Sequence, residues 1–362
     1  MIRKRVFFAL LVAAMLLSAC GAPAATQVPA VTEAASATEP SLATEAPVVE
    51  VSGNLVVYSG RSEPLIQPLM DAFKAKYPNV EVLLKAGKNS ELANALLEEK
   101  TNPQADIFIT TELFTVQSLA QQGVFQSYLP VGAENLPAEF IGPGNAWIGL
   151  TRRARVIMYN TELVSPGEAP TSIFDLTDPK WKGRIAAAGS TNGSMQAQIA
   201  VMRQLLGEPA TEEWLNGLLA NEAAFLGGHT DVRKAVGAGE FQIGLVNHYY
   251  YYLQQAEGSK VGIVFPDQGE GQIGLITNAT AAGIVNGAPN PAAAQAFMDF
   301  LISAEGQKLF TELNYEYPLL PGVEIHSEVQ PLSDFRLADV NVAQSALEFD
   351  ATFDLIERIG LP

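Results

Sequence analysis

Four of the chain's ten tyrosines stand in one run, Tyr249 to Tyr252. A phenol has an ordinary pKa of about 10, so it keeps its proton at neutral pH unless a strongly acidic partner, above all a trivalent metal ion, displaces it. A phenolate oxygen is a hard anionic donor of the kind that such an ion prefers. The alternative is aromatic packing at a strand end, in which the rings are buried and the hydroxyls remain in contact with water. The run by itself leaves both interpretations open.

The position of the run favours a ligand site. Residues 241–246 form an apolar stretch that predicts a buried strand, and open α/β sheets bind ligands beyond the carboxyl ends of their strands. Successive side chains of a strand point to opposite faces, so Tyr249 and Tyr250 can share a ligand only if the chain turns into a helix there. Tyr251 and Tyr252 are then expected to pack that helix, and His248 to support the site by packing.

The amino terminus predicts export. Residues 1–5 are basic and residues 6–18 are apolar but too short to span a bilayer, so residues 1–19 read as a signal peptide. Leu17-Ser18-Ala19-Cys20 matches the bacterial lipobox, and the match resembles lipoproteins whose cysteine is acylated. Cys20 is the chain's one cysteine, which excludes disulfides within the chain and thiolate metal sites. The alternative is an ordinary secretory signal with an incidental cysteine.

Composition divides the rest of the chain. Residues 20–52 are rich in Ala, Thr, Pro and Glu without periodicity, which predicts a disordered tether. The remaining residues exceed one ordinary hydrophobic core and favour two lobes. The formal charge is −17 and no basic patch is visible, so a nucleic-acid partner is not expected.

Strand-like and helix-like stretches alternate along the folded part, which is typical of a parallel sheet with crossover helices. The predicted strands are 54–59, 80–84 and 105–110, and the predicted helices are 64–76, 90–100, 115–122, 195–206, 211–220, 230–238 and a two-part helix over 291–310. Residues 147–159 are an apolar run broken by three arginines, where we expect a crossover between lobes. The motifs H-E-x-x-H, Walker A and G-x-S-x-G are absent, so the protein is not expected to be an enzyme.

Six short motifs stand in an order that resembles the ferric-ion-binding proteins, the substrate-binding components of iron(III) ABC importers. They are Tyr58-Ser59-Gly60-Arg61, Ala105-Asp106-Ile107-Phe108, Arg153-Ala154-Arg155-Val156, Ser190-Thr191-Asn192-Gly193-Ser194, Gly244-Leu245-Val246-Asn247-His248-Tyr249-Tyr250 and Asn314-Tyr315-Glu316-Tyr317-Pro318. The resemblance covers residue 54 to the end. It implies the α/β, two-lobed fold of type II periplasmic binding proteins, in which each lobe is a mostly parallel sheet flanked by helices and a hinge joins them. Lobe 1 would be 53–155 with a return of 280–322, lobe 2 would be 156–279, and 323–362 would be a C-terminal helical segment.

The same resemblance implies the site. Tyr249 and Tyr250 match the family's adjacent ferric ligands, and Arg153 matches the arginine that holds the synergistic anion, carbonate or phosphate. The family's anion cradle at a helix start falls on Thr191, Asn192, Gly193 and Ser194, where free N–H groups favour negative charge.

Two departures from the family pattern concern the remaining ligands. Where several members have a histidine the chain reads Arg61-Ser62-Glu63, and Ser194-Met195 stands where others carry a third tyrosine. The iron would then be held by two phenolates and a bidentate anion, completed by water or by a carboxylate from Glu63 or Glu112. For Glu63 the alternative is a structural role. A carboxylate in the first turn of a helix interacts favourably with the helix macrodipole.

The resemblance implies a monomeric receptor, anchored to membrane lipid through Cys20, that captures Fe(III) and delivers it to an ABC permease and its ATPase. Within the same fold the alternative is uptake of a small organic ligand such as a polyamine, thiamine or a phosphonate. An alternative from another class is a secreted sugar- or phosphate-processing enzyme.

Overall fold

The computed structural model describes residues 50–362, which form one compact unit. The predicted signal peptide, Cys20 and residues 20–49 of the predicted tether lie outside the described residues. In the described part of the chain, no helix is both long and apolar enough to cross a bilayer.

The first lobe is built on three parallel strands. Strand β1 (Gly53–Ser59) lies between β2 (Val80–Ala86) and β3 (Ile107–Thr110). Helices α1 (Glu63–Lys76) and α2 (Asn89–Glu98) are the crossovers, and α3 (Leu113–Gln121) follows β3. The predicted alternation of strands and helices is confirmed here. On α1 the apolar side chains at helical spacing, among them Leu69 and Phe73, are the buried ones.

The second lobe repeats the pattern with β5 (Ile185–Ala188), β6 (Ala224–Leu226) and β7 (Ile243–Asn247), all parallel. Its helices are α4 (Gly193–Leu206), α5 (Glu208–Ala220), α6 (His229–Gly237) and α7 (His248–Ala256). Strands β5 and β6 were not predicted, because β5 consists of one isoleucine and three alanines and β6 has only three residues.

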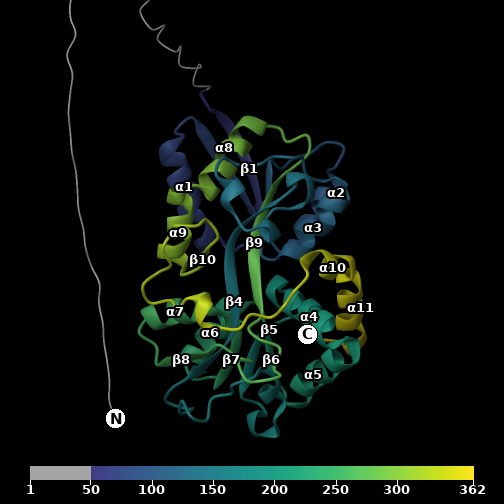
Figure 1. The fold of residues 1–362 in the computed structure, drawn as a ribbon, viewed down its shortest axis with the longest axis vertical. Coiled ribbons are helices and arrows are strands. Elements are labelled where there is room, and N and C mark those ends of the chain that lie inside the picture. Colours follow the sequence, from purple (N-terminus) through teal and green to yellow (C-terminus); the bar gives the residue numbers. More distant parts are fainter. Residues whose placement is uncertain (1–49) are drawn as a thin grey trace, which may run out of the picture. The chain divides into compact units, whose positions relative to one another are not determined.

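Two long antiparallel strands join the lobes. Strand β4 (Ile148–Asn160) pairs with β9 (Thr277–Ile284) through its first half and with β7 and β8 (Val261–Val264) through its second. The sheet order is β2-β1-β3-β9-β4-β7-β5-β6, with β10 (Tyr317–Pro318) also on β4. Figure 1 shows β4 and β9 running together between the two sets of strands. The crossover expected over 147–159 is therefore confirmed, and the fold is the expected two-lobed α/β architecture.

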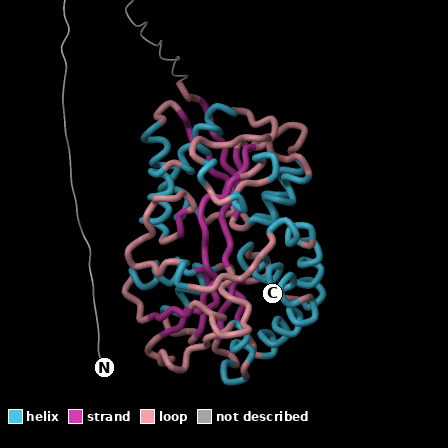
Figure 2. The backbone as a smooth tube through the Cα atoms, viewed as in Figure 1, coloured by secondary structure: helices cyan, strands magenta, loops and turns pink. Residues whose placement is uncertain are grey.

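Helices cover the strands on their flanks (Figure 2), and each lobe has its own buried core. Helices α8 (Pro291–Ile302) and α9 (Ala304–Asn314) return to the first lobe, where Phe297 packs against Phe73. The expected helical segment 323–362 is helical only from residue 342, and residues 323–341 form an irregular chain of turns with one 3-10 helix, Leu332–Asp334. The helices of this segment are α10 (Val342–Leu347) and α11 (Phe349–Ile359).

Candidate functional site

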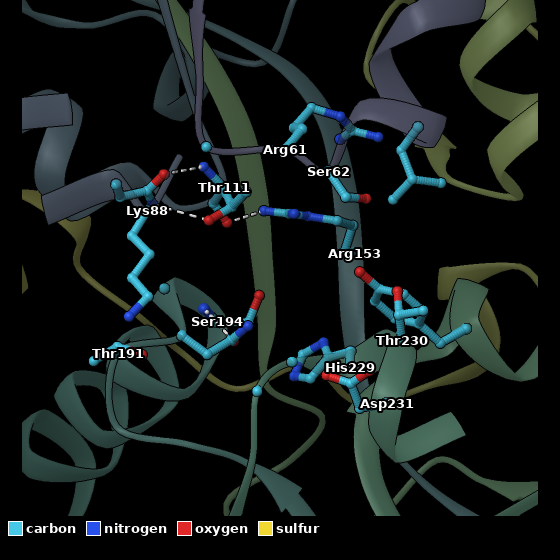
Figure 3. A pocket seen from close by; sticks show the side chains of 18 of the residues that line it. Arg61, Ser62, Lys88, Thr111, Arg153, Thr191, Ser194, His229, Thr230 and Asp231 are labelled. Carbon is cyan, nitrogen blue, oxygen red and sulfur yellow. Dashed lines mark hydrogen bonds between the residues drawn. The ribbon is translucent and has the colours of Figure 1, made fainter. Parts of the chain in front are cut away.

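A cavity of about 190 Å³ lies where all six parallel strands end. Its wall consists of the residues that follow each strand, together with Leu65 and one strand residue, Arg153. From the first lobe these are Gly60, Arg61, Ser62, Gly87, Lys88, Asn89 and Thr111, and from the second Thr191, Asn192, Gly193, Ser194, Gly227, Gly228, His229, Thr230, Asp231, Tyr249 and Tyr250. Figure 3 shows side chains from both lobes pointing into this cavity. The cavity thus lies where a ligand site was predicted, beyond the carboxyl ends of the strands.

Tyr249 and Tyr250 stand side by side on the cavity wall. Strand β7 ends at Asn247 and α7 begins at His248, so both tyrosines lie in the first turn of a helix. Their ring centroids are 4.2 Å apart, and the residues are only 3% and 9% exposed. Burial, and then the neighbouring Tyr249, raises the pKa of Tyr250 well above its ordinary value. The predicted turn into a helix is confirmed, and it brings both phenols to one cavity.

The other residues of the aromatic run pack the helix, as expected. The Tyr252 hydroxyl accepts a hydrogen bond from Gln330 N at 3.3 Å, and neither Tyr251 nor Tyr252 lines the cavity. His248 accepts from Ala154 N at 3.2 Å through Nδ1 and contacts Tyr315 O at 2.9 Å through Nε2. Burial lowers the pKa of His248 to about 3, so the ring is neutral and its role is structural.

Arg153 reaches the cavity from β4 and is 1% exposed. Its Nη2 donates to Thr111 O, and its Nε has no partner among the described residues. A buried guanidinium without a carboxylate partner is costly unless an anion completes its hydrogen bonds. The arrangement therefore favours an anionic ligand beside the tyrosines.

The segment 191–194 lines the cavity, but its backbone is less free than the sequence indicated. The Asn192 side chain caps α4 by accepting from Ser194 N at 3.1 Å and Met195 N at 3.2 Å. Two of the N–H groups at this helix start are thus already bonded. The Ser194 hydroxyl accepts from Asn247 Nδ2 at 3.1 Å, which joins the segment to the strand that precedes the tyrosines.

The two carboxylates expected as further ligands do not line the cavity. Glu63 is exposed in the first turn of α1, where its carboxylate interacts favourably with the helix macrodipole, as in the alternative structural role. Glu112 is fully buried as the N-cap of α3, where it accepts from Phe114 N and Thr115 N and from Asn89 Nδ2. The structure gives no support to either as a ligand, because Glu112 caps α3 and Glu63 lies outside the cavity wall.

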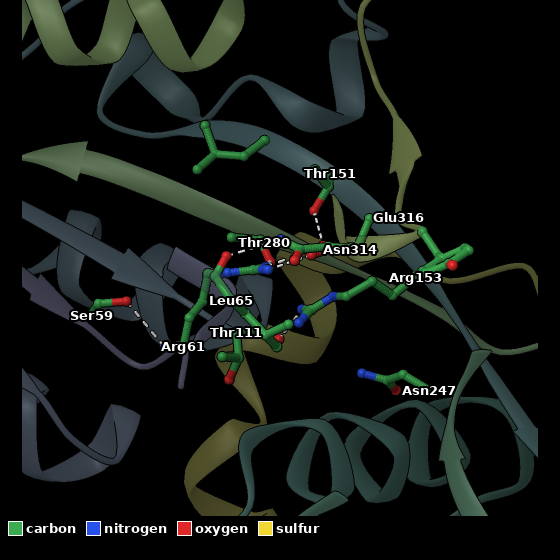
Figure 4. A network of polar contacts seen from close by, with 12 residues as sticks. Ser59, Arg61, Leu65, Thr111, Thr151, Arg153, Asn247, Thr280, Asn314 and Glu316 are labelled. Carbon is green, nitrogen blue, oxygen red and sulfur yellow. Dashed lines mark hydrogen bonds and ion pairs between the residues drawn. The ribbon is translucent and has the colours of Figure 1, made fainter. Parts of the chain in front are cut away.

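Arg61 occupies the place where the family pattern has a histidine. It is 3% exposed and pairs through both terminal nitrogens with Glu316, and its Nη1 also donates to Thr280 Oγ1 at 2.9 Å (Figure 4). Burial alone would lower the pKa of Arg61, but Glu316 raises it more, so the guanidinium stays charged. The pair ties the end of β1 to β9 and to the residue before β10.

Behind the tyrosines lies a third buried arginine, Arg155. Arg155 Nε donates to Gln198 Oε1 at 2.8 Å, and Nη1 lies 2.9 Å from His229 Nε2. Its Nη2 has no partner among residues 50–362. Burial lowers the pKa of Arg155 to about 9, which leaves it charged at neutral pH. The His229 ring stands edge-on to Tyr250 at 5.2 Å, so this network supports the cavity wall.

A family model described as "Bacterial extracellular solute-binding protein" matches residues 102–339. The chain belongs to this family. It is 34% identical over 307 residues to "Iron uptake protein A1" of Synechocystis sp., which covers 80% of this chain and 83% of that protein. Iron-bound HitA from Pseudomonas aeruginosa has a TM-score of 0.78 at 27% identity and covers 85% of this chain and 99% of that one. Trichodesmium IdiA (FutA), solved with iron and citrate ligands, has a TM-score of 0.69 at 34% identity. It covers 86% of this chain and 100% of that one.

In this solute-binding protein, several cavity residues escaped the sequence analysis, three of them with charged or ionisable side chains. Lys88, His229 and Asp231 stand in segments that match no known binding motif. The pair Gly227-Gly228 directly after β6 was the available signal, since glycines at a strand end mark a turn beside a possible site.

Proposed function

We propose that this family member is an extracytoplasmic receptor that captures Fe(III) with a synergistic anion and delivers it to an ABC importer. One observation carries the proposal: two adjacent phenols share a cavity with a buried arginine that has no anionic partner among residues 50–362. Ferric iron is a hard acid that prefers anionic oxygen donors. The relatives named for iron uptake or solved with iron support the same cargo.

In the proposed site Tyr249 and Tyr250 bind iron as phenolates, and an oxyanion such as carbonate or phosphate bridges the metal to Arg153. A guanidinium can hold such an anion through two parallel hydrogen bonds. Thr191, Asn192, Gly193 and Ser194 form the opposite wall of the anion site. Water completes the coordination in place of Glu63 and Glu112, which do not line the cavity.

The division into lobes 53–155 with 280–322 and 156–279 stays a prediction, with the hinge in β4 and β9, which pair across both lobes. We further propose that Cys20 is acylated and anchors the receptor to membrane lipid. The receptor would act as a monomer and bind solute without turning it over.

The test is an absorption titration of purified protein with ferric iron in bicarbonate buffer. Phenolate-to-iron charge transfer should give a visible band, which an organic ligand would not produce. Tyr249→Phe and Tyr250→Phe should abolish or shift the band, whereas Tyr251→Phe, on the same helix but outside the cavity, is the matched control. Equal effects of all three substitutions, or a colourless wild type, would refute the assignment.

A further inference from the structure

Building on the proposed function, we propose that residues 339–362 form a strap across the two lobes that stabilises the closed form and slows the release of iron. The strap contains α10 and α11. Helix α10 packs on α3 of the first lobe and on α4 of the second, and α11 packs on α4 and α5 (Figure 1). One segment therefore joins two helices, α3 and α4, that begin on opposite sides of the cavity.

Polar contacts hold the strap to the second lobe. Gln204 of α4 binds the start of α10, because its Oε1 accepts from Asn341 N at 3.2 Å and from Ser345 Oγ at 2.8 Å. Farther along, Arg358 of α11 forms an ion pair with Glu208 of α5 at 2.7 Å. Hydrogen bonds and an ion pair thus fix both helices of the strap to one lobe, so the strap moves with the second lobe.

The contacts of the strap with the first lobe are apolar. The ring of Phe349, at the start of α11, lies 5.4 Å from the ring of Phe114 on α3, and these residues are 4% and 3% exposed. Phe114 is a first-lobe residue, yet this contact makes it part of the buried core of the second lobe. Val342 packs against the cores of both lobes. Among residues 50–362, no hydrogen bond or ion pair joins the strap to the first lobe.

The strap also fits the first lobe less closely than the second. Two hollows, of about 440 Å³ and about 80 Å³, lie between residues 338–342 and the first lobe, where Trp147 lines the larger and Phe140 the smaller. Atoms that line a hollow lack packing partners on one side, which weakens the attraction there. The contact with the first lobe is therefore the one expected to break when the lobes move apart.

Opening of the cleft requires that this contact break. Helix α4 begins at Gly193, where a Cβ would lie 2.7 Å from Thr111 Oγ1, just before α3. Movement of the lobes apart separates the starts of α3 and α4, and the strap, which is bonded to α4, then leaves α3. Phe114 and Phe349 lose their contact, and exposure of their apolar surface to water is unfavourable. The strap thus opposes opening both with and without iron.

The test measures iron release to a chelator at pH 7, together with small-angle scattering of the iron-free protein. Phe114→Ala removes the first-lobe side of the contact and should speed release about tenfold, as expected for loss of a buried aromatic pair. Gln204→Ala loosens the second-lobe side and should speed release about threefold. Both iron-free variants should be larger in solution than the wild type. Gln204 is half-buried, so its substitution tests the strap even where Phe114→Ala does not fold.

Phe125→Ala and Gln67→Ala are the matched controls. Phe125 is 7% exposed and packs on Phe108 within the first lobe, and Gln67 forms its side-chain hydrogen bond within α1. Neither control should change the release rate by more than about twofold. The double variant Phe114→Ala/Gln204→Ala should release iron no faster than Phe114→Ala alone, because a strap that has already left α3 no longer opposes opening.

Three results would overturn the strap and leave the proposed function standing: a release rate of Gln204→Ala equal to that of Gln67→Ala, unchanged dimensions of the iron-free variants, or effects that multiply in the double variant. A wild-type protein that forms no coloured complex with ferric iron would instead refute the proposed function.

Discussion

The phenols of Tyr249 and Tyr250 must lose protons to bind iron. Because burial and the neighbouring Tyr249 raise the pKa of Tyr250 far above neutrality, its proton is present in the iron-free protein and is released on binding. We therefore expect iron binding to liberate about one proton fewer in Tyr250→Phe than in the wild type. Proton release is measured with a pH indicator in weakly buffered solution, at matched iron occupancy. Tyr252→Phe is the control, and equal release by all three proteins would contradict a phenolate at position 250.

Arg153 provides a second prediction for a single residue. Arg153→Lys keeps the positive charge but loses the planar guanidinium that can bind an oxyanion through two hydrogen bonds. The substitution should therefore weaken iron retention about tenfold and change the dependence of retention on bicarbonate. The measurement is competition with a chelator at several bicarbonate concentrations. Arg152→Lys is the control, because Arg152 lies on the same strand, donates to Thr277 Oγ1 and does not line the cavity. Undiminished retention by Arg153→Lys in anion-free buffer would mean that protein ligands alone hold the iron.

Among the elements, the start of α4 lies against the first lobe at Gly193. A Cβ there would lie 2.7 Å from Asn89 Nδ2 and 2.7 Å from Thr111 Oγ1, atoms that bond each other at 2.9 Å. Gly193→Ala should therefore oppose closure of the lobes and weaken iron binding by roughly tenfold, since closure contributes to affinity. Gly167→Ala, where a Cβ meets nothing within 4 Å, is the control. Scattering should show the Gly193→Ala protein more open with iron present; unchanged dimensions and affinity would contradict the prediction.

The contact of β1 with the β10 segment depends on the buried Arg61–Glu316 pair. Burial raises the pKa of Glu316, but Arg61 lowers it more, so the net pKa lies below its ordinary value. The pair's stabilisation is thus present above the unfolded pKa of Glu316 and is lost as pH falls through the folded value. Glu316→Gln leaves Arg61 buried without its partner and should cost about 3–5 kcal/mol at pH 7.

The measurement is urea unfolding of the iron-free protein at pH 7 and at acid pH. The difference between Glu316→Gln and wild type should shrink in acid, where Glu316 is protonated in both states of the wild type. Glu305→Gln is the control, because it breaks the exposed Lys76–Glu305 pair and should change stability little. A Glu316→Gln cost no larger than that of the control would show that the buried pair does not stabilise the fold.

For the whole molecule, iron release should couple to opening of the two lobes. Protons compete with iron for the phenolates and for the anion, so affinity falls as pH decreases. The closed form then loses the ligand that stabilises it, and the lobes move about β4 and β9. A titration from about neutral to about pH 5, followed by colour and by small-angle scattering, should show both changes together. A colour that persists through acid, or that disappears without a change in dimensions, would contradict the coupling.

The local sequence pattern was sufficient to predict much of the fold and the tyrosine pair of this protein. Alternating strands and helices predicted the first lobe, and an apolar run broken by arginines predicted β4 as the connection. The tyrosine run at a strand end predicted two phenols on one wall, because the turn from β7 into α7 is a local event. These features depend on neighbours in the sequence, which the chain displays directly.

Other features were decided only by the tertiary structure. Glu112 looked like a ligand by position, yet folding brought it to the N-terminal amides of α3 and to Asn89 instead. The sequence could not show that Asn192 would bond the amides expected to hold an anion. Lys88 and Asp231 reach one cavity from different lobes, 143 positions apart by their residue numbers. Contacts between distant segments depend on how the strands assemble into the sheet. A local sequence pattern therefore cannot predict which side chains come into contact.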